Sequence, residues 1–380
     1  MNYSIPFHKS SLLGRELDYV AEAVRGGQIA GDGPFAARCR EFLQQRFGIE
    51  RVFLTPSGSA ALDLVAAMCW TDGDEVILPS FTFVSTANAV ARVGARPVFV
   101  DIRDDTLNID TELIEAAITP RTKAIVPVHY AGVSCDMDRI LKIAVQFDLM
   151  VVEDAAQAVD AYYRERPLGT LGALGMYSFH GTKNFTSGQG GALCVNDPQL
   201  LARSEVLYEK GTNRAQFLRG EATEYEWVDV SSSYTPSELA CAFLWGQLEA
   251  MDEAAQKRAT LYANYERLLQ PLVTDGFLKL LTTPQECRRN HHLFGVLLAD
   301  GVARARVIDD LARAGIQVAA HFVPLHSSRM GKQLGGRLGD LPVTESCSAR
   351  LLRLPFYLEL SRSDQERIVE QLHTTLLAHA

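Results

Sequence analysis

Apolar and amphipathic stretches alternate along the chain from residue 51 to residue 195. The amphipathic or helix-length stretches include residues 111–118 and 136–147. The short apolar runs have the length and β-branched content of buried strands and lie at 51–54, 75–78, 96–102, 123–128, 149–153, 175–179 and 190–195. Strands and helices that alternate in this way predict an α/β fold, with a mostly parallel central sheet and helices on both faces.

The two ends of the chain have different patterns. Helices are predicted at 14–25 and 36–47 before the first strand, and a long helix is predicted at 237–267. Beyond about residue 268 the pattern predicts a small α+β unit, with strands at 294–298 and 316–322 and helices at 303–314 and 363–378. Because 380 residues exceed one ordinary core, we expect a large domain at 1–250 and a smaller C-terminal domain at 251–380.

Composition excludes several classes of protein. Apolar residues make up 47% of the chain and charged residues 22%, which is typical of soluble globular proteins. The net charge of −9 argues against nucleic acid as the main partner, and no apolar stretch is long enough to predict a membrane span. The seven cysteines are scattered and form no close metal-type pair, so we expect no metal site and a reducing cytoplasm.

A loop rich in glycine, serine and threonine joins the strands predicted at 175–179 and 190–195, and it carries Lys183. Polar neighbours, among them His180 and Asn184, surround this lysine in the sequence. An amine held in a cleft between two strands can form a Schiff base with a carbonyl compound. The alternative, a solvated surface lysine, is more common for a single lysine.

Asp154 follows the apolar run at 149–153, one strand before that loop. Ligands of open α/β sheets bind outside the carboxyl ends of the strands. A carboxylate there and a nearby lysine match the needs of pyridoxal 5′-phosphate, which requires an anion opposite its pyridine nitrogen and an amine for its aldehyde. The alternative is that Asp154 caps a following helix.

Ser57, Gly58 and Ser59 precede a helix of small and apolar residues. Free backbone N–H groups, hydroxyl donors and a glycine that permits close approach form an anion site in outline. A serine that only caps the helix is the alternative. A separate polar segment at 210–236 is too long for a simple connection and is therefore expected to be functional or interfacial.

Several motifs together resemble one known family, the pyridoxal-phosphate aminotransferases of nucleotide sugars, which have the aspartate-aminotransferase fold (fold type I). The likeness runs essentially from end to end. The motifs that carry it are GDGP at 31–34, PSGSAAL at 56–62, PSFTFVSTANAV at 79–90, VPVHYAG at 126–132, VVEDAAQ at 151–157, SFHGTKN at 178–184, GQGGA at 188–192, HFVPLH at 321–326 and RLPFY at 353–357.

The resemblance implies a role for each matching residue. Lys183 would form the Schiff base and act as the catalytic base, Asp154 would pair with the pyridinium nitrogen, and Gln157 would approach the ring hydroxyl. Phe83 would stack on the ring. The phosphate would be held by Gly58, Ser59 and Ser178, and the sugar nucleotide by Lys210, Asn213 and His321.

The chain departs from the family pattern at two places. Many relatives have GYNYR where this chain has SSSYT at 231–235, so Ser233 takes the position of an asparagine that reaches the phosphate of the partner subunit. Gln189 stands where relatives often have an acidic residue. The resemblance still implies a homodimer, with the segment 210–236 completing the partner's site.

Within the family, the likeness favours transamination of dTDP-4-keto-6-deoxyglucose with glutamate, giving dTDP-4-amino-4,6-dideoxygalactose and 2-oxoglutarate for enterobacterial common antigen synthesis. A related dehydratase branch has histidine in place of the lysine, so Lys183 favours transamination. The 4-epimeric product and another substrate of a pyridoxal-phosphate aminotransferase remain alternatives. A nicotinamide-linked oxidoreductase is disfavoured because no GxGxxG turn follows a strand, and a non-catalytic sensor because no helix-turn-helix unit is attached.

Overall fold

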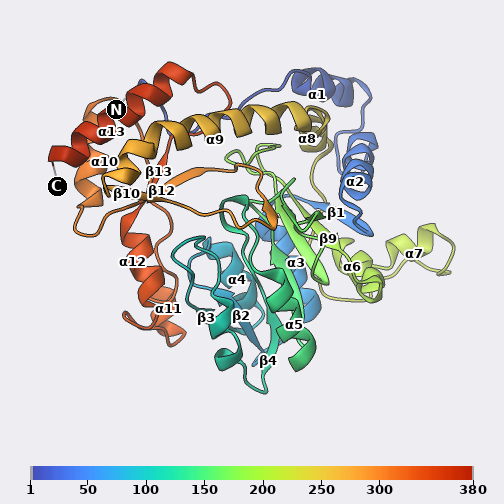
Figure 1. The fold of residues 1–380 in the computed structure, drawn as a ribbon. Coiled ribbons are helices and arrows are strands. Elements are labelled where there is room, and N and C mark those ends of the chain that lie inside the picture. The colour runs from blue at the N-terminus through green and yellow to red at the C-terminus, as the bar shows by residue number, and fades with distance from the viewer. Residues whose placement is uncertain (1–2, 379–380) are drawn as a thin grey trace.

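The computed structural model describes residues 3–378 and has a seven-stranded sheet at its centre (Figure 1). The strand order is β1-β9-β8-β5-β4-β2-β3, and the strands from β8 to β3 are parallel. Only β9 runs antiparallel to its two neighbours in this sheet. The strands span Arg51–Thr55 (β1), Glu75–Pro79 (β2), Arg96–Val100 (β3), Thr122–Ile125 (β4), Met150–Asp154 (β5), Leu174–Ser178 (β8) and Gly191–Val195 (β9). The predicted mostly parallel α/β sheet is confirmed.

Helices cover both faces of this sheet because successive side chains of a strand point to opposite faces, and the side chains on both faces are apolar. In β9, Ala192 and Cys194 pack into one core cluster, and Leu193 and Val195 pack into another. The first cluster is closed by α1 (Glu16–Arg25), α2 (Pro34–Phe47), α5 (Met137–Phe147) and α8 (Glu238–Glu249). The second is closed by α3 (Gly58–Cys69), α4 (Val84–Arg92) and α6 (Leu201–Tyr208).

The C-terminal part has a separate antiparallel sheet of three strands, in the order β10-β12-β13. Its apolar side chains form their own core cluster together with the helices beside them. The elements are β10 (Leu278–Leu280), β12 (Phe294–Leu298), β13 (Leu351–Leu354), α9 (Met251–Thr274), α10 (Arg304–Arg313) and α13 (Arg362–Ala378). A domain boundary near residue 250 stays a prediction.

Two short helices, α11 (Arg329–Gln333) and α12 (Pro342–Arg350), connect this sheet to the large one, and a small sheet pairs β6 (Tyr162–Tyr163) with β7 (Arg166–Pro167) and β11 (Cys287–Arg288). No helix among residues 3–378 is long and apolar enough to cross a membrane.

Three predicted elements were wrong. The stretch 237–267 is two helices, α8 and α9, because the backbone at Ala250 leaves the helical region (φ −100°, ψ 17°) and ends α8. Helix α9 then runs from the first core, at Met251 and Ala254, into the second, from Leu261 on. The segment 316–322 is not a strand, since it makes only isolated bridges to Ile5 and Arg353 while β13 takes the place beside β12. The stretch 111–118 forms two 3₁₀ turns (Thr111–Leu113 and Glu115–Ala117) and no α-helix.

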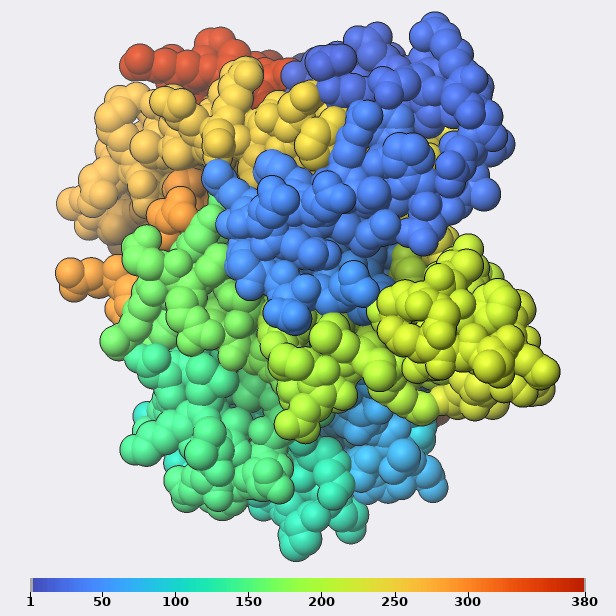
Figure 2. All heavy atoms as spheres, turned by 90° about the vertical axis from the view of Figure 1, so that its right-hand side faces the viewer, coloured from blue at the N-terminus to red at the C-terminus, as the bar shows by residue number. Residues whose placement is uncertain are grey.

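The polar segment after α6 leaves the body of the molecule as an arm. It contains the short helix α7 (Arg214–Leu218), and isolated bridges from Glu209 to Ser233 and from Thr212 to Trp227 hold its two limbs together. In Figure 2 the yellow-green atoms of this region form a lobe that stands out from the neighbouring surface. The arm exposes apolar side chains to solvent, with Trp227 at 75% and Val230 at 78%.

Candidate active site

A cavity of about 450 Å³ lies at the carboxyl ends of the parallel strands. Strand β5 ends at Asp154 and strand β8 at Ser178, both of which line the cavity. Helix α3 begins there with Gly58, directly after β1, and Phe83 follows β2. Lys183 lies on the loop between β8 and β9 and also lines the cavity. The fold therefore brings the predicted lysine, carboxylate and anion site together at the edge where α/β sheets bind ligands.

Lys183 presents its amine to this cavity from a tight turn. The turn is closed by a hydrogen bond of 2.9 Å from the Lys183 N–H to the carbonyl of His180. Burial lowers the pKa of the Lys183 amine to about 8, although the Asp154 carboxylate acts in the opposite direction. About a tenth of an amine with this pKa is uncharged at pH 7, far more than for an ordinary lysine, and the uncharged form is the one that attacks an aldehyde.

This shift predicts the pH dependence of cofactor capture. In the protein without cofactor, the rate of Schiff-base formation with pyridoxal phosphate should increase as pH rises through about 8 and level off above it, because deprotonation supplies the nucleophile. Stopped-flow absorbance measures this rate, with Lys183→Ala as the control that should show no capture. A rate that keeps rising up to the pKa of an ordinary lysine would contradict a depressed pKa.

Asp154 is buried and has its carboxylate fixed by two donors. Thr86 donates its hydroxyl to Oδ2 at 2.8 Å, and the N–H of Ala156 donates to Oδ1 at 3.1 Å. Thr82 lies within 3.0 Å of the Thr86 hydroxyl and steadies it. Residues 155–161, directly after β5, form turns and no helix, so Asp154 closes a local turn and does not cap a helix. Asp154 also lines the cavity, where its carboxylate is available to a ligand.

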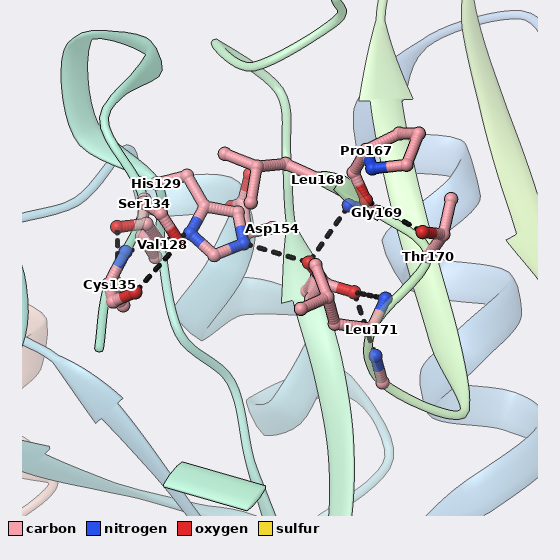
Figure 3. A network of polar contacts seen from close by, with 12 residues as sticks. Val128, His129, Ser134, Cys135, Asp154, Pro167, Leu168, Gly169, Thr170 and Leu171 are labelled. Carbon is pink, nitrogen blue, oxygen red and sulfur yellow. Dashed lines mark hydrogen bonds and ion pairs between the residues drawn. The ribbon is translucent and has the colours of Figure 1, made fainter. Parts of the chain in front are cut away.

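The neighbouring Glu153 extends to the opposite face of β5 and binds separate segments of the chain, among them those of His129 and Gly169, which Figure 3 labels. Its carboxylate accepts the N–H groups of Gly169, Leu171 and Gly172 at 2.6–2.8 Å. It also accepts Nε2–H of His129 at 3.0 Å, since Nδ1 of His129 accepts the N–H of Cys135. These bonds fix the strand end that carries Asp154.

The N-terminus of α3 borders the cavity, and its role as an anion cradle stays a prediction. Ser57 caps the helix by accepting the N–H of Ala60 at 3.1 Å, so the capping alternative is also true, and Ser59 shares a 2.6 Å hydrogen bond with Ser85. A Cβ at Gly58 would lie 2.7 Å from Met176 Cε and 3.1 Å from Ser178 Cβ, so glycine permits the close packing of this helix on β8. Backbone N–H groups and the hydroxyls of Ser59 and Ser178 border the same space.

Gln157 and Phe83 take the positions expected of cofactor neighbours. The side-chain oxygen of Gln157 accepts the N–H of Ala131 at 2.7 Å, which assigns its NH₂ end to the cavity. The ring of Phe83 is 59% exposed although it borders a cavity, and its centroid lies 6.4 Å from that of Phe322. An exposed aromatic face of this kind is available for stacking.

His321 lines the opposite wall, as predicted, and shares a 3.0 Å hydrogen bond with the hydroxyl of Tyr130. Burial, followed by the charge of Arg353, lowers the pKa of His321 to about 2, so this histidine is neutral. Sequence reasoning missed Thr86, His292 and Arg353, which also line the cavity. The signal for Arg353 was present, since a charged residue interrupts the apolar strand β13.

Three predicted residues lie outside the cavity within one chain. Lys210 and Ser233 are exposed at the base of the arm. Asn213 is buried, and its side chain binds the backbone of Glu224 and Glu226 at 2.8–2.9 Å, which braces the arm. Roles for these residues at a ligand therefore require a second copy of the chain, and they stay predictions.

Comparison with known proteins identifies the family. Residues 11–373 match the model of the DegT/DnrJ/EryC1/StrS aminotransferase family. The chain belongs to this family. It is similar to GDP-perosamine synthase of Caulobacter vibrioides (35% identity, 96% of each chain) and to the spore coat polysaccharide biosynthesis protein SpsC of Bacillus subtilis (34% identity, 97% of this chain and 96% of the relative).

Solved structures agree with this assignment. The chain resembles Spr1654 of Streptococcus pneumoniae in its PLP form, with a TM-score of 0.90 and 26% identity over the whole of both chains. It also resembles DesV of S. venezuelae (TM-score 0.88, 28% identity, 99% of each chain). The fold is therefore that of the fold type I enzymes, and the protein is a sugar aminotransferase that uses pyridoxal phosphate.

The residues in the cavity fit this cofactor. The α3 cradle suits its phosphate, the Phe83 ring its flat face, Asp154 its ring nitrogen and Lys183 its aldehyde. When bound, the cofactor supplies an electron sink for the carbon from which a proton is removed. Asp154 would hold a negative charge opposite the ring nitrogen, and the Lys183 amine would serve as the base that moves the proton.

Proposed function

We propose that this chain transfers the amino group of glutamate to C4 of dTDP-4-keto-6-deoxyglucose, giving dTDP-4-amino-4,6-dideoxygalactose and 2-oxoglutarate. The supporting observation is that the HFVPLH and RLPFY segments meet at one wall of the cavity. They contribute His321, Phe322 and Arg353 opposite Lys183. These two segments are among the motifs that carry the resemblance to the nucleotide-sugar aminotransferases. The proposal includes the cytoplasm as the compartment and enterobacterial common antigen as a destination of the product.

The experiment is to incubate the holoenzyme with dTDP-4-keto-6-deoxyglucose and glutamate and to determine the product by NMR. The coupling constants at C4 distinguish the galacto from the gluco amine. The GDP-linked 4-keto-6-deoxy sugar is the comparison substrate, because GDP-perosamine synthase is 35% identical to this chain. A kcat/KM that favours the GDP sugar, or a gluco product, would refute the proposed substrate or product while leaving aminotransferase activity in place.

We further propose a homodimer in which the arm completes the partner's site. Supporting features are the exposed Leu218, Trp227 and Val230 on the arm and the position of Ser233 outside its own chain's cavity. Several large apolar side chains exposed on one segment would mark an interface if they form a patch. Ser233 would contact the partner's phosphate directly or through a water.

Shared sites predict complementation. A Lys183→Ala subunit mixed with a subunit damaged at 231–234 should recover activity, up to about a quarter of the wild-type value if the subunits mix statistically and one site of the hybrid is intact. Sedimentation of the holoenzyme measures the assembly. The control is each variant alone, which should be inactive. A fully active monomer would contradict the arrangement.

A further inference from the structure

The side chain of Asn184, the residue directly after Lys183, is buried and held from two sides. Its NH₂ group donates to the carbonyl of Asn290 at 2.9 Å, and its Oδ1 lies 2.8 Å from Nδ1 of His292. A flipped amide would set its oxygen against the carbonyl of Asn290, so Oδ1 faces His292 and Nδ1 of His292 carries the proton that it donates. Two bonds from one short segment therefore fix the chain next to the proposed Schiff-base lysine.

The backbone of this segment, residues 290–292, is itself held in place by its surroundings. His291 has a positive φ of 53°, which costs free energy for a residue with a Cβ. Arg258 of α9 donates to the carbonyls of His291 and His292, at 2.9 and 2.6 Å. A strained conformation persists where neighbouring groups impose it, and here both flanking residues bind Asn184.

The same segment also contacts the turn that carries Gln157. The NH₂ group of Asn290 donates to the carbonyls of Gln157 and Val159, at 2.9 and 2.8 Å. A Cβ at Gly132 would overlap Oδ1 of Asn290, so glycine permits this close approach. This segment thus links the two loops that bring Lys183 and Gln157 to the cavity.

The second nitrogen of the His292 ring is not used by Asn184, and the ring lines the cavity. Burial lowers the pKa of His292 well below its ordinary value, so the ring is neutral and Nε2 has a lone pair that can accept a hydrogen bond. His292 therefore has two candidate actions, through Nδ1–H on the loop of Lys183 or through Nε2 on a ligand. The first is supported by a contact that is already made, at 2.8 Å to Asn184.

We propose that His292 is a positioning residue for Lys183 and acts through Asn184. The inference rests on the proposed Schiff-base role of Lys183 and is independent of which sugar the enzyme aminates. The hydrogen bond from Nδ1 holds Asn184, and Asn184 holds the turn from which the amine of Lys183 enters the cavity. Without the donor, a buried amide oxygen loses its partner, so the turn should relax and the amine should spend less time in its reacting position.

Two variants of His292 distinguish its two nitrogen atoms. One atom separates Nδ1 from Cβ, as for the NH₂ of asparagine, and two atoms separate Nε2 from Cβ, as for the NH₂ of glutamine. His292→Asn therefore keeps a donor to Asn184, whereas His292→Gln loses this donor and keeps a polar group at the Nε2 position.

The first measurement is capture of pyridoxal phosphate by the cofactor-free protein, followed by stopped-flow absorbance. Its rate should fall roughly 10-fold or more in His292→Gln and less than about 3-fold in His292→Asn. In the holoenzyme, the rate of cofactor conversion by glutamate should fall by up to about 10²-fold in His292→Gln. The glutamate concentration for half-maximal rate should change less than about 3-fold, because position and not affinity is lost.

A double-mutant cycle tests whether His292 acts through Asn184. Asn184→Ala should slow capture about as much as His292→Gln, and the double variant should stay within about 3-fold of Asn184→Ala alone. Asn196→Ala is the matched control, because the Asn196 amide also donates to two backbone carbonyls, those of Gly169 and Gly172, but lies outside the cavity. Its capture rate should stay within about 3-fold of the wild-type rate.

A wild-type capture rate in His292→Gln would overturn the inference. So would a loss in His292→Asn alone, which would assign the ring to a ligand through Nε2, and losses that multiply in the double variant, which would make His292 independent of Asn184. Equal losses of rate and of thermal stability in both His292 variants would reduce His292 to a structural residue. Capture by Lys183→Ala would instead refute the role of Lys183 on which the inference rests.

Discussion

Lys183→Ala is expected to lower the rate of transamination by about 10³-fold or more while the protein still folds. The substitution removes the proposed nucleophile, which is also the proposed base, and a positioned base alone contributes about 10²- to 10⁴-fold. The Lys183 side chain makes no hydrogen bond or ion pair with the rest of residues 3–378, so its loss should change the free energy of unfolding by less than about 1 kcal/mol. Single-turnover kinetics and thermal unfolding measure the two effects.

Lys257→Ala is the matched control for this prediction. Lys257 is exposed and pairs with Glu253 at 2.7 Å, one helical turn away on α9. Its replacement should cost about 0.3–0.5 kcal/mol of stability and leave turnover unchanged. Reduction with borohydride tests the covalent role directly, because it should fix the cofactor to the Lys257→Ala protein and not to Lys183→Ala. Near-normal turnover with borohydride fixation in Lys183→Ala would assign the Schiff base to another residue.

The sequence pattern was sufficient for the large sheet because both of its faces are buried. A parallel strand covered by helices on both sides is a nearly continuous apolar run, as at 149–153, and such runs are easily recognised. The same reasoning placed Asp154 and Lys183 correctly at one edge, since carboxyl ends of parallel strands meet there. The residue types near the strand ends and the order of the strands were therefore enough to predict where Asp154 and Lys183 lie.

The other half of the site could not be derived from periodicity. Arg353 and His321 reach the cavity from the C-terminal part, where pairing between distant segments decides which residues form a strand. Residues 316–322 have the apolar alternation of a strand, yet β13 has the better pairing with β12. The break at Ala250 also has no glycine or proline to mark it, and Met251 and Ala254 after it pack in the same core as α8, so the apolar pattern continues across the break.

Asp154→Asn is expected to lower kcat by roughly 10²- to 10³-fold, the usual loss when one electrostatic group is removed from a water-excluded site. Asparagine has nearly the same shape and can still accept the hydroxyl of Thr86, so the fold should be retained. Asp154→Glu keeps the charge, and its effect on the free energy of unfolding should be much smaller than the effect of Asp154→Asn on kcat. Steady-state kinetics and denaturant titration measure the two quantities.

A second buried carboxylate separates the effect of charge at the cofactor from the effect of losing any buried acid. Asp160 is buried outside the cavity and accepts the hydroxyl of Tyr162 at 2.9 Å. Because Asp160 does not line the cavity, Asp160→Asn should leave kcat within about 3-fold. An unchanged rate in Asp154→Asn would reduce Asp154 to the residue that closes the turn at Ala156. A large loss in Asp154→Asn alone requires that its negative charge acts on the bound ring, because both substitutions replace one buried carboxylate by an amide of the same shape.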